Sequence, residues 1–398
     1  MFANKYLEKN NRKALIISEP SQFLEMVVVI PCFCEPDILS TLNSLLKCQL
    51  PKSDVEIIIL INHSEISDEE IKSFNRNTKW EIDAWIETIN SERLRFYVAG
   101  PIEFNKKWAG VGLARKAGMD EAVLRFNKLE KAHGIIVSLD ADTLVEKNYL
   151  IEIERYFNTH PTHIGATISF KHQTDGLEPK HLEGIRLYEK YLLYFKNALE
   201  YVGYPYAMFT VGSAFAVRAG AYVKRGGMTR RQAGEDFYFL QNLAQQGIVG
   251  EINSTKVLPS ARISNRVPFG TGPILQKWMN GNEDLNKTYN FQAFEDLKQF
   301  FQLKESFFKQ DKIVFEELMR KMPESIQQFI KIDNFEKEVK DLNRNCSTLS
   351  TFQSRFFQKF NAFKIIKFLN FCHDVMYEKL DIEKQVQLLE NETKKMAT

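Results

Sequence analysis

The chain has 398 residues, 44% of them hydrophobic and 26% charged, proportions typical of a folded, water-soluble protein of two or three domains. Its formal net charge of +2 does not favour nucleic acid as a partner. No segment approaches the roughly 20 apolar residues of a membrane span, and the polar N-terminus lacks the apolar core of a secretory signal, so a cytoplasmic location is predicted. Five irregularly spaced cysteines favour free thiols over a disulfide framework or a zinc site.

The first half of the chain alternates apolar runs with amphipathic segments. After a polar extension over residues 1–25, buried strands are predicted at 26–31, 55–62, 94–99, 135–142 and 163–170. The other segments have the apolar spacing of helices, at 37–48, 67–89, 110–127, 148–157 and 181–202. This alternation predicts an α/β fold, with a mostly parallel sheet flanked by helices.

The remaining residues complete this domain and add a helical region. Residues 211–227 predict a short strand and a helix, 235–247 a helix, and 257–272 a strand followed by a loop. From about residue 281 the strand patterns disappear, and phenylalanines recur at helical spacing. We therefore predict an N-terminal extension (1–25), an α/β domain (26–280) and a helical C-terminal region (281–398).

The apolar run that begins at Ile135 ends in Asp140-Ala141-Asp142. Residues two apart on a strand point to the same face, so both carboxylates are predicted to reach one spot beyond the carboxyl end of the strand. Open α/β sheets bind their ligands at this edge. One or two carboxylates together with substrate phosphates are the usual ligands of Mg²⁺ or Mn²⁺. The alternative is that Asp142 or Thr143 only caps the next helix.

A more specific pattern comes from four segments that follow one another in order: VVVIPCFCEP, AGVGLARKAGMDEA, SLDADT, and GSAFAVRAGAYVKRGGM with GEDFYFLQNLAQQG. Together they resemble the family 2 glycosyltransferases, which are inverting nucleotide-sugar enzymes with the GT-A fold. The resemblance covers about residues 26–272. It implies a GT-A-like, Rossmann-type catalytic domain, a nucleotide-sugar donor that is most often a UDP-sugar, and a hydroxyl acceptor on a glycan or a lipid-linked saccharide.

The resemblance assigns roles to the residues at the strand ends. It implies that Asp142 contacts the Mn²⁺ or Mg²⁺ ion directly, and that Asp140 holds the ribose or the water shell of the metal. Pro31 and Glu35 occupy the positions that hold the nucleobase and ribose. Asn62 stands where the family usually has a base-binding aspartate, which leaves the identity of the base open.

Further donor contacts are implied for glycines and arginines. Gly110 and Gly112 allow close backbone approach at a helix start, and Arg115 lies one turn into that helix. Gly212 belongs to the segment that lines the donor sugar pocket. No histidine occurs between residues 181 and 373, so the histidine that often completes the metal site is absent, and Arg266 is the candidate to grip the diphosphate.

The acceptor side is marked by Gly234-Glu235-Asp236 at the start of a helix. Inverting transfer needs a base that takes the proton of the acceptor hydroxyl. The resemblance favours Asp236 for this role, with Glu235 as the second candidate or as the group that orients the acceptor. The alternative is that both acids only complement the helix dipole.

Two other functions are alternatives to glycosyl transfer. A nucleotidyltransferase would need a Gly-, Arg- or Lys-rich loop after the first strand, where this chain has PCFCEP. A non-catalytic carbohydrate- or nucleotide-binding protein on a degenerate transferase fold is the other alternative.

The C-terminal helices either pack as a subdomain or make peripheral membrane contact. The candidate surface is residues 359–371, where Lys359, Lys364 and Lys367 alternate with Phe and Ile.

Overall fold

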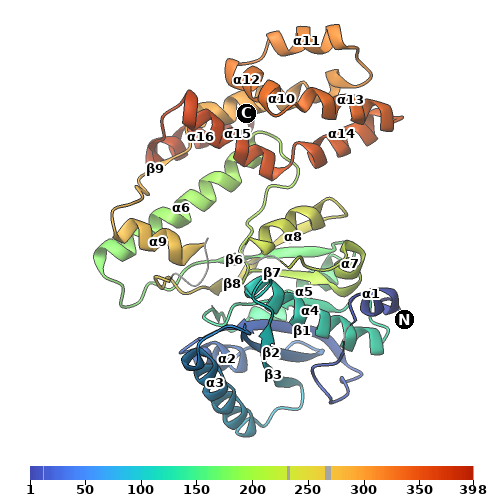
Figure 1. Cartoon of the computed structure of the whole chain (residues 1–398), viewed down its shortest axis with the longest axis vertical. Coiled ribbons are helices and arrows are strands. Elements are labelled where there is room, and N and C mark those ends of the chain that lie inside the picture. Colours follow the sequence, from blue (N-terminus) through green and yellow to red (C-terminus); the bar gives the residue numbers. More distant parts are fainter. Residues whose placement is uncertain (12, 231–233, 265–269, 398) are drawn as a thin grey trace. The chain divides into compact units, whose positions relative to one another are not determined.

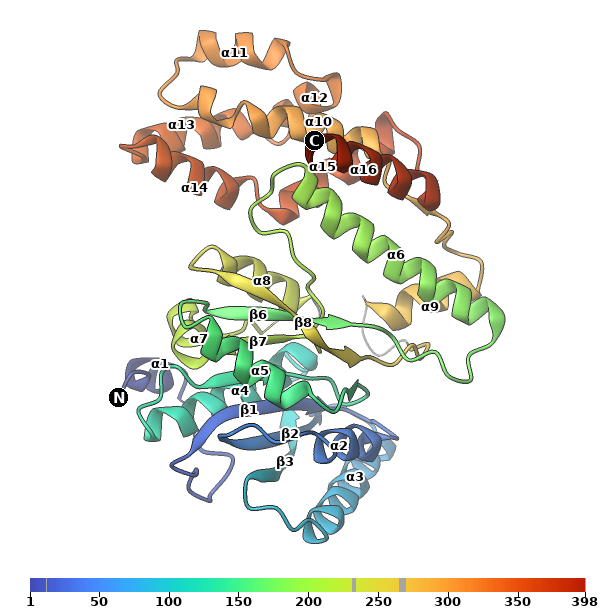
Figure 2. The same cartoon turned by 180° about the vertical axis from the view of Figure 1, so that it is seen from behind.

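The computed structural model describes residues 1–398 except residues 12, 231–233, 265–269 and 398. The chain divides into two compact units, and each is built from two separate stretches of sequence. The first unit comprises residues 1–177 and 210–276, and the second comprises 178–209 and 277–398. Figures 1 and 2 label their elements from opposite sides.

The first unit is built around an eight-stranded sheet in the order β3-β2-β1-β4-β7-β6-β8-β5. Strand β1 pairs in parallel with both β2 and β4, and β2 pairs in parallel with β3. Strands β1, β2 and β4 are almost wholly buried and mostly apolar, since helices cover both of their faces, whereas the edge strand β3 is only partly buried. The bounds of this half of the sheet are β1 Leu24–Cys32, β2 Asp54–Ser64, β3 Leu94–Phe104 and β4 Ile135–Ser138.

The other half of the sheet is mixed. Strand β7 (Phe215–Arg218) pairs antiparallel with both β4 and β6 (Gly165–Phe170). Strand β8 pairs in parallel with β6 and antiparallel with the two-residue β5 (Leu144–Val145). The predicted class, an α/β fold with a mostly parallel sheet flanked by helices, is confirmed.

Strand β8 spans Val249–Leu258, so the prediction that this strand begins at residue 257 is wrong. Its residues Ile252, Thr255 and Val257 are buried, while Asn253 and Ser254 are exposed, and its pairing with β6 is interrupted by a register shift. Only the very short β5 lies beyond β8 in the sheet, so most of this strand is close to an edge. Polar side chains are tolerated there, and they hide the strand pattern in the sequence.

Helices cover both faces of the sheet. Met26, Val28 and Ile30 of β1 point to one face, where they share a core with α2, α3 and α5. Val29 points to the other face, where α4 approaches so closely that a Cβ at Gly118 would lie 2.4 Å from Val29 Cγ1. The helices of this unit are α1 Asn4–Lys9, α2 Ile38–Leu46, α3 Glu69–Glu87, α4 Val111–Lys128, α5 Tyr149–Thr159, α7 Ala219–Arg225, α8 Glu235–Ala244 and, across the unit boundary, α9 Thr271–Met279.

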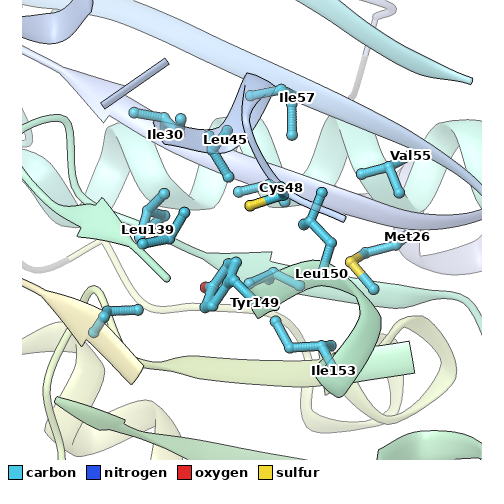
Figure 3. Close-up of a cluster of buried hydrophobic side chains, with 14 of the residues drawn as sticks. Met26, Ile30, Leu45, Cys48, Val55, Ile57, Leu139, Tyr149, Leu150 and Ile153 are labelled. Atoms are coloured by element: carbon cyan, nitrogen blue, oxygen red, sulfur yellow. The ribbon is translucent and has the colours of Figure 1, made fainter. Parts of the chain in front are cut away.

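Figure 3 shows part of the larger core, in which aliphatic side chains of the sheet meet those of the helices on one face. Tyr149 is fully buried at the start of α5, and its hydroxyl has no hydrogen-bond partner among the described residues. This core fixes the strand ends that carry the acidic residues. The labelled members are Met26, Ile30, Leu45, Cys48, Val55, Ile57, Leu139, Tyr149, Leu150 and Ile153.

The N-terminal segment is fastened to α4 by a buried polar network. Tyr6 Oη donates to Asp120 Oδ1 at 2.6 Å, and Tyr222 Oη donates to the same oxygen at 2.9 Å. Lys116 Nζ donates to Tyr6 Oη at 2.8 Å and pairs with Asp120 Oδ2 at 3.0 Å. A buried carboxylate with an ammonium and two hydroxyl donors is well satisfied, so the network holds α1 and α4 together.

The second unit is helical apart from the short pair of strands β9 (Lys287–Thr288) and β10 (Leu380–Asp381), which the sequence does not predict. Its core is a cluster of buried phenylalanine rings from several helices: Phe300, Phe301, Phe307, Phe335, Phe356 and Phe360. The helices are α6 Pro179–Tyr201, α10 Phe291–Gln302, the 3₁₀ turn Lys304–Phe307, α11 Lys312–Arg320, α12 Glu324–Ile332, α13 Phe335–Asn345, α14 Leu349–Lys359, α15 Ala362–Val375 and α16 Ile382–Ala397. Helix α6 therefore groups with the C-terminal helices, whereas the sequence analysis places it in the domain 26–280.

The apolar side of α15 belongs to this core. Phe360, Ile365 and Phe368 are fully buried, and Lys364 lies between Asp333 and Glu338. The segment 359–371 thus uses its apolar residues for packing within the unit. Among the described residues, no helix is both long and apolar enough to cross a membrane.

Candidate active site

Several chain segments meet where the parallel strands end. Strand β1 ends at Cys32, and β4 ends at Ser138, which pairs with Phe215 at the start of β7. The loops beyond these points carry the predicted acidic residues. The carboxyl edge of a parallel sheet is the usual ligand-binding position of open α/β folds.

The Asp-Ala-Asp segment forms a turn and is not part of the strand. Strand β4 stops at Ser138, and Thr143 N donates to Asp140 O at 3.1 Å to close the turn. Thr41 Oγ1 donates to Ala141 O at 2.8 Å and holds the turn against α2. The prediction that both aspartates share one strand face is therefore wrong. The next helix, α5, has Asn148 at its N-cap, so neither Asp142 nor Thr143 caps it.

Arg115 connects Asp140 with the acidic motif Glu235-Asp236, which the sequence analysis predicts to lie at the acceptor. Its Nη2 donates to Asp140 Oδ1, and its Nη1 donates to Glu235 Oε1. The Arg115 side chain is only 2% exposed and that of Glu235 3%, while Asp140 is 36% exposed. The sequence analysis assigns these three residues to different roles, and the structure brings them into one cluster that is buried at Arg115 and Glu235 and accessible at Asp140.

Gly212 packs directly against the guanidinium of Arg115. A Cβ at this position would lie 2.8 Å from Arg115 Nη2 and 3.2 Å from Cζ. Ser138 Oγ donates to Gly212 O at 2.7 Å, which holds the glycine against the end of β4. The contacts of Gly212 show close approach to a guanidinium, and its place in the donor sugar pocket stays a prediction.

Replacing Gly212 with alanine is expected to push the Arg115 guanidinium away from Asp140 and Glu235, and to lower the free energy of unfolding by about 1–3 kcal/mol, as overpacking commonly does. Urea unfolding and calorimetric titration with UDP and GDP would measure both effects. The matched control is Gly184→Ala in the second unit, whose Cβ would crowd Trp278 at 2.4 Å. It should cost stability without changing nucleotide affinity. Unchanged stability in Gly212→Ala would contradict the packing argument.

Burial shifts the pKa values of Glu235 and Asp236, and Arg115 opposes the shift in both. Burial raises the pKa of Glu235 to about 7, although Arg115 acts in the opposite direction. Burial also raises the pKa of Asp236, again against Arg115, and Phe237 N donates to Asp236 Oδ1 at 2.7 Å. Burial alone would lower the pKa of Arg115, but Asp140 and Glu235 outweigh it and keep the guanidinium charged. Raised carboxyl pKa values in a cleft are typical of proton-transfer sites.

A second arginine joins the other two predicted acids. Arg262, in the loop after β8, contacts Glu35 through Nη1–Oε1 at 3.0 Å and Nη2–Oε2 at 2.6 Å. Its Nη2 also lies 3.4 Å from Asp142 Oδ2. The hydrogen bonds to Glu35 raise the pKa of Arg262, so it stays charged. The sequence analysis favours Arg266 for this loop, and Arg266 lies outside the described residues.

Asn62 sits at the end of β2 and is buried. Its Nδ2 donates to Cys32 O at 3.0 Å, which ties the ends of β1 and β2 together. Asn75 of α3, which the sequence analysis misses, donates from Nδ2 to Asn62 O at 3.0 Å and accepts from Cys34 N at 3.0 Å. The only sign of this role for Asn75 in the sequence is that a polar residue falls on the buried side of the predicted helix. This pair of asparagines shapes the loop in which a nucleobase was predicted.

Three of the remaining candidates contribute backbone at the same edge. Pro31 is buried near the end of β1, paired with Leu60 of β2. Gly110 is the N-cap of α4, and Gly112 is buried in its first turn. The free N–H groups of such a helix start suit the phosphates of a nucleotide.

A divalent ion would have few protein ligands here. Among the described residues, no group of three His, Cys, Asp or Glu side chains could hold one. Asp142 is 32% exposed, so its carboxylate is accessible to an ion that also binds substrate phosphates. One carboxylate with phosphates and water is a common arrangement for Mg²⁺, so the residues fit such an ion as part of a ternary complex.

Residues 135–314 match the model of a family described as Glycosyl transferase family group 2. The segment contains Asp140, Asp142, Gly212 and the acids at 235 and 236. No curated protein matches the sequence.

Two solved structures are among those that match the chain. S. aureus TarS 1–349 in complex with UDP-GlcNAc is 12% identical, with a TM-score of 0.43 over 84% of this chain and 92% of that one. The mannosyltransferase PcManGT from Pyrobaculum calidifontis, in complex with GDP-Man and Mn²⁺, is 13% identical, with a TM-score of 0.40 over 98% of this chain and 90% of that one. At such TM-scores neither likeness bears on the site, and the family match carries the assignment.

Proposed function

Residues 135–314 are a glycosyltransferase segment of family group 2, and we propose that the chain transfers a sugar, with inversion, from a nucleotide diphosphate sugar to a hydroxyl acceptor. A UDP-sugar is the proposed donor. The proposed acceptor is a glycan or a lipid-linked saccharide. The domain limits 26–280 and 281–398 remain part of this proposal.

The observation that supports the proposal most strongly is the buried bridge from Asp140 through Arg115 to Glu235. An inverting transfer needs the leaving diphosphate on one side of the anomeric carbon and a base on the other side. The bridge brings the turn at Asp140 and the helix start at Glu235 within the span of one guanidinium.

The proposal gives each of these residues a separate role in the transfer. Asp236 takes the proton of the acceptor hydroxyl, and burial raises the pKa of its carboxyl, which makes it a stronger base. Glu235, held by Arg115, orients the acceptor side. Arg262 and the helix start at Gly110 bind the diphosphate. Mn²⁺ or Mg²⁺, bound at Asp142, would neutralise charge on the leaving diphosphate as a Lewis acid.

The proposal predicts binding of a nucleoside diphosphate that depends on a divalent metal. Calorimetric titration with UDP and with GDP, each in Mn²⁺ and then in EDTA, tests this directly. One nucleotide is expected to bind in Mn²⁺ and to lose most of its affinity in EDTA. A panel of sugars on that nucleotide then identifies the donor by its turnover.

Each negative result points to a different alternative. If neither nucleotide binds, the donor site is wrong. If a nucleotide sugar binds but is never turned over with any acceptor, the chain is a binding protein on a transferase fold. Release of pyrophosphate from a nucleoside triphosphate would instead indicate a nucleotidyltransferase.

A further inference from the structure

Arg262 lies between two acids to which the sequence analysis gives separate roles, Glu35 at the nucleoside and Asp142 at the metal. Its guanidinium makes two contacts with Glu35 and one with Asp142. Asp37 adds a third negative charge nearby, which also favours the charged arginine. A cation is therefore already present at the carboxylate that is assigned to the metal.

The interaction of Arg262 with Glu35 is stronger than its interaction with Asp142. The pair with Glu35 is a two-point fork at 2.6 and 3.0 Å, and the Glu35 side chain is only 3% exposed. The contact with Asp142 is a single approach of 3.4 Å to a carboxylate that is 32% exposed, where solvent and salt screen it. When another cation approaches Asp142, this second contact is the one that yields.

The charges favour a metal that arrives together with a nucleotide. A divalent ion at Asp142 would face the positive guanidinium of Arg262, which Glu35 keeps close by, and like charges at such short range repel each other. A nucleoside diphosphate brings several negative charges that pair with both cations. The same arginine thus opposes the metal alone and favours the metal with the diphosphate.

We propose that Arg262 is a charge gate at Asp142, which disfavours a divalent cation in the nucleotide-free protein and pairs with the diphosphate once metal and nucleotide bind together. The inference rests on the proposed function, because it takes Asp142 as the metal ligand. It adds to that function an order of binding. Since coupling between two ligands is reciprocal, the gate makes Mn²⁺ and nucleotide each increase the affinity for the other.

The test measures Mn²⁺ binding rather than turnover. Free Mn²⁺ is followed by electron paramagnetic resonance during titration of the protein, without nucleotide and with saturating UDP or GDP. Arg262→Gln removes the charge but keeps a polar side chain. Without nucleotide, this variant is expected to bind Mn²⁺ about tenfold more tightly than the wild type, since a like charge has been removed from beside the ion. The gain in Mn²⁺ affinity on adding nucleotide is expected to shrink.

Two control variants separate charge from structure. Arg262→Lys keeps the charge and loses the fork, so Mn²⁺ should remain weakly bound without nucleotide even if Arg262→Gln proves hard to fold. Arg155→Gln removes an arginine that pairs with Glu152 on the exposed side of α5 and lies outside the site, and it should leave Mn²⁺ binding unchanged.

The outcomes distinguish the gate from the proposed function. If the wild type and Arg262→Gln bind Mn²⁺ equally well without nucleotide, or if Arg262→Lys binds it as tightly as Arg262→Gln, the gate is overturned while Asp142 keeps its role. If tight binding in Arg262→Gln survives Asp142→Asn, the ion lies elsewhere and the gate is again overturned. If the wild type binds no Mn²⁺ even with UDP or GDP, the metal role in the proposed function fails, and the gate fails with it.

Discussion

Replacing Asp236 with asparagine is expected to lower kcat by about 10²–10⁴-fold and to leave nucleotide affinity unchanged. The amide has the size of the carboxylate and still accepts the hydrogen bond from Phe237 N, now 2.7 Å from Asp236 Oδ1, but it cannot take a proton. Steady-state transfer from the nucleotide sugar that binds, together with calorimetry on the nucleotide, measures the two effects separately.

Two variants show whether the loss is specific. Asp68→Asn changes the residue at the N-cap of α3, outside the site, and tests the view that an acid at a helix start matters only for the helix dipole. It should leave kcat unchanged. Full activity in Asp236→Asn together with lost activity in Glu235→Gln would transfer the role of the base to Glu235.

Replacing Arg115 with methionine is expected to lower the free energy of unfolding by about 3 kcal/mol, the lower part of the range for breaking a buried ion pair from one side. Most of this loss comes from Glu235, which is 3% exposed and would be left without its cation. Asp140 contributes less, because it is 36% exposed and water can solvate it. Urea unfolding monitored by circular dichroism measures the change.

The stability deficit of Arg115→Met should also depend on pH. Folding raises the pKa of Glu235 from 4.5 to about 7, so the native state binds more protons than the unfolded state in this window. The free energy of unfolding therefore decreases as the pH rises from 4.5 to 7. Without Arg115 the native pKa rises further, and the decrease continues above pH 7. The deficit should be larger at pH 8 than at pH 5, and equal deficits would exclude Glu235 as its source.

The double variant Arg115→Met/Glu235→Gln separates the pair from its surroundings. With Glu235 neutral as well, the protein no longer has to bury the Glu235 carboxylate without its cation, so part of the stability lost in Arg115→Met should return. If the double variant loses more free energy of unfolding than the two single variants lose together, the two residues do not interact as the contacts indicate.

The sequence predicts the elements of the first unit well, because burial leaves a direct pattern. Strands β1, β2 and β4 are covered on both faces and are therefore continuously apolar. Strand β8 does not show this apolar pattern, since its position near the edge of the sheet allows polar residues on it. The pattern places Asp140 and Asp142 at the carboxyl end of a strand over 135–142, whereas β4 stops at Ser138 and both residues lie in the turn beyond it.

The pairing of charges in the site could not be predicted in this way. Arg115 meets Asp140 and Glu235 at separations of 25 and 120 positions, and Arg262 meets Glu35 at a separation of 227. Hydrophobic periodicity describes one element at a time and carries no information about which charged side chains face each other across a site. Even the turn at Asp140-Ala141-Asp142 depends on hydrogen bonds from Thr143 and from Thr41 of α2, which a local pattern does not contain.

The interleaved course of the chain has a practical consequence for dissecting the protein. Helix α6 lies in the second unit, although the chain passes through it between two stretches of the first. Its buried residues Ile185, Tyr194 and Leu199 pack within that unit, and Tyr194 Oη donates to Tyr289 O at 3.0 Å. A truncation near residue 280 would remove most partners of these side chains and leave an apolar helix tethered at both ends, a surface prone to aggregation. Isolating the first unit requires a short linker in place of residues 178–209 as well as removal of the C-terminal residues.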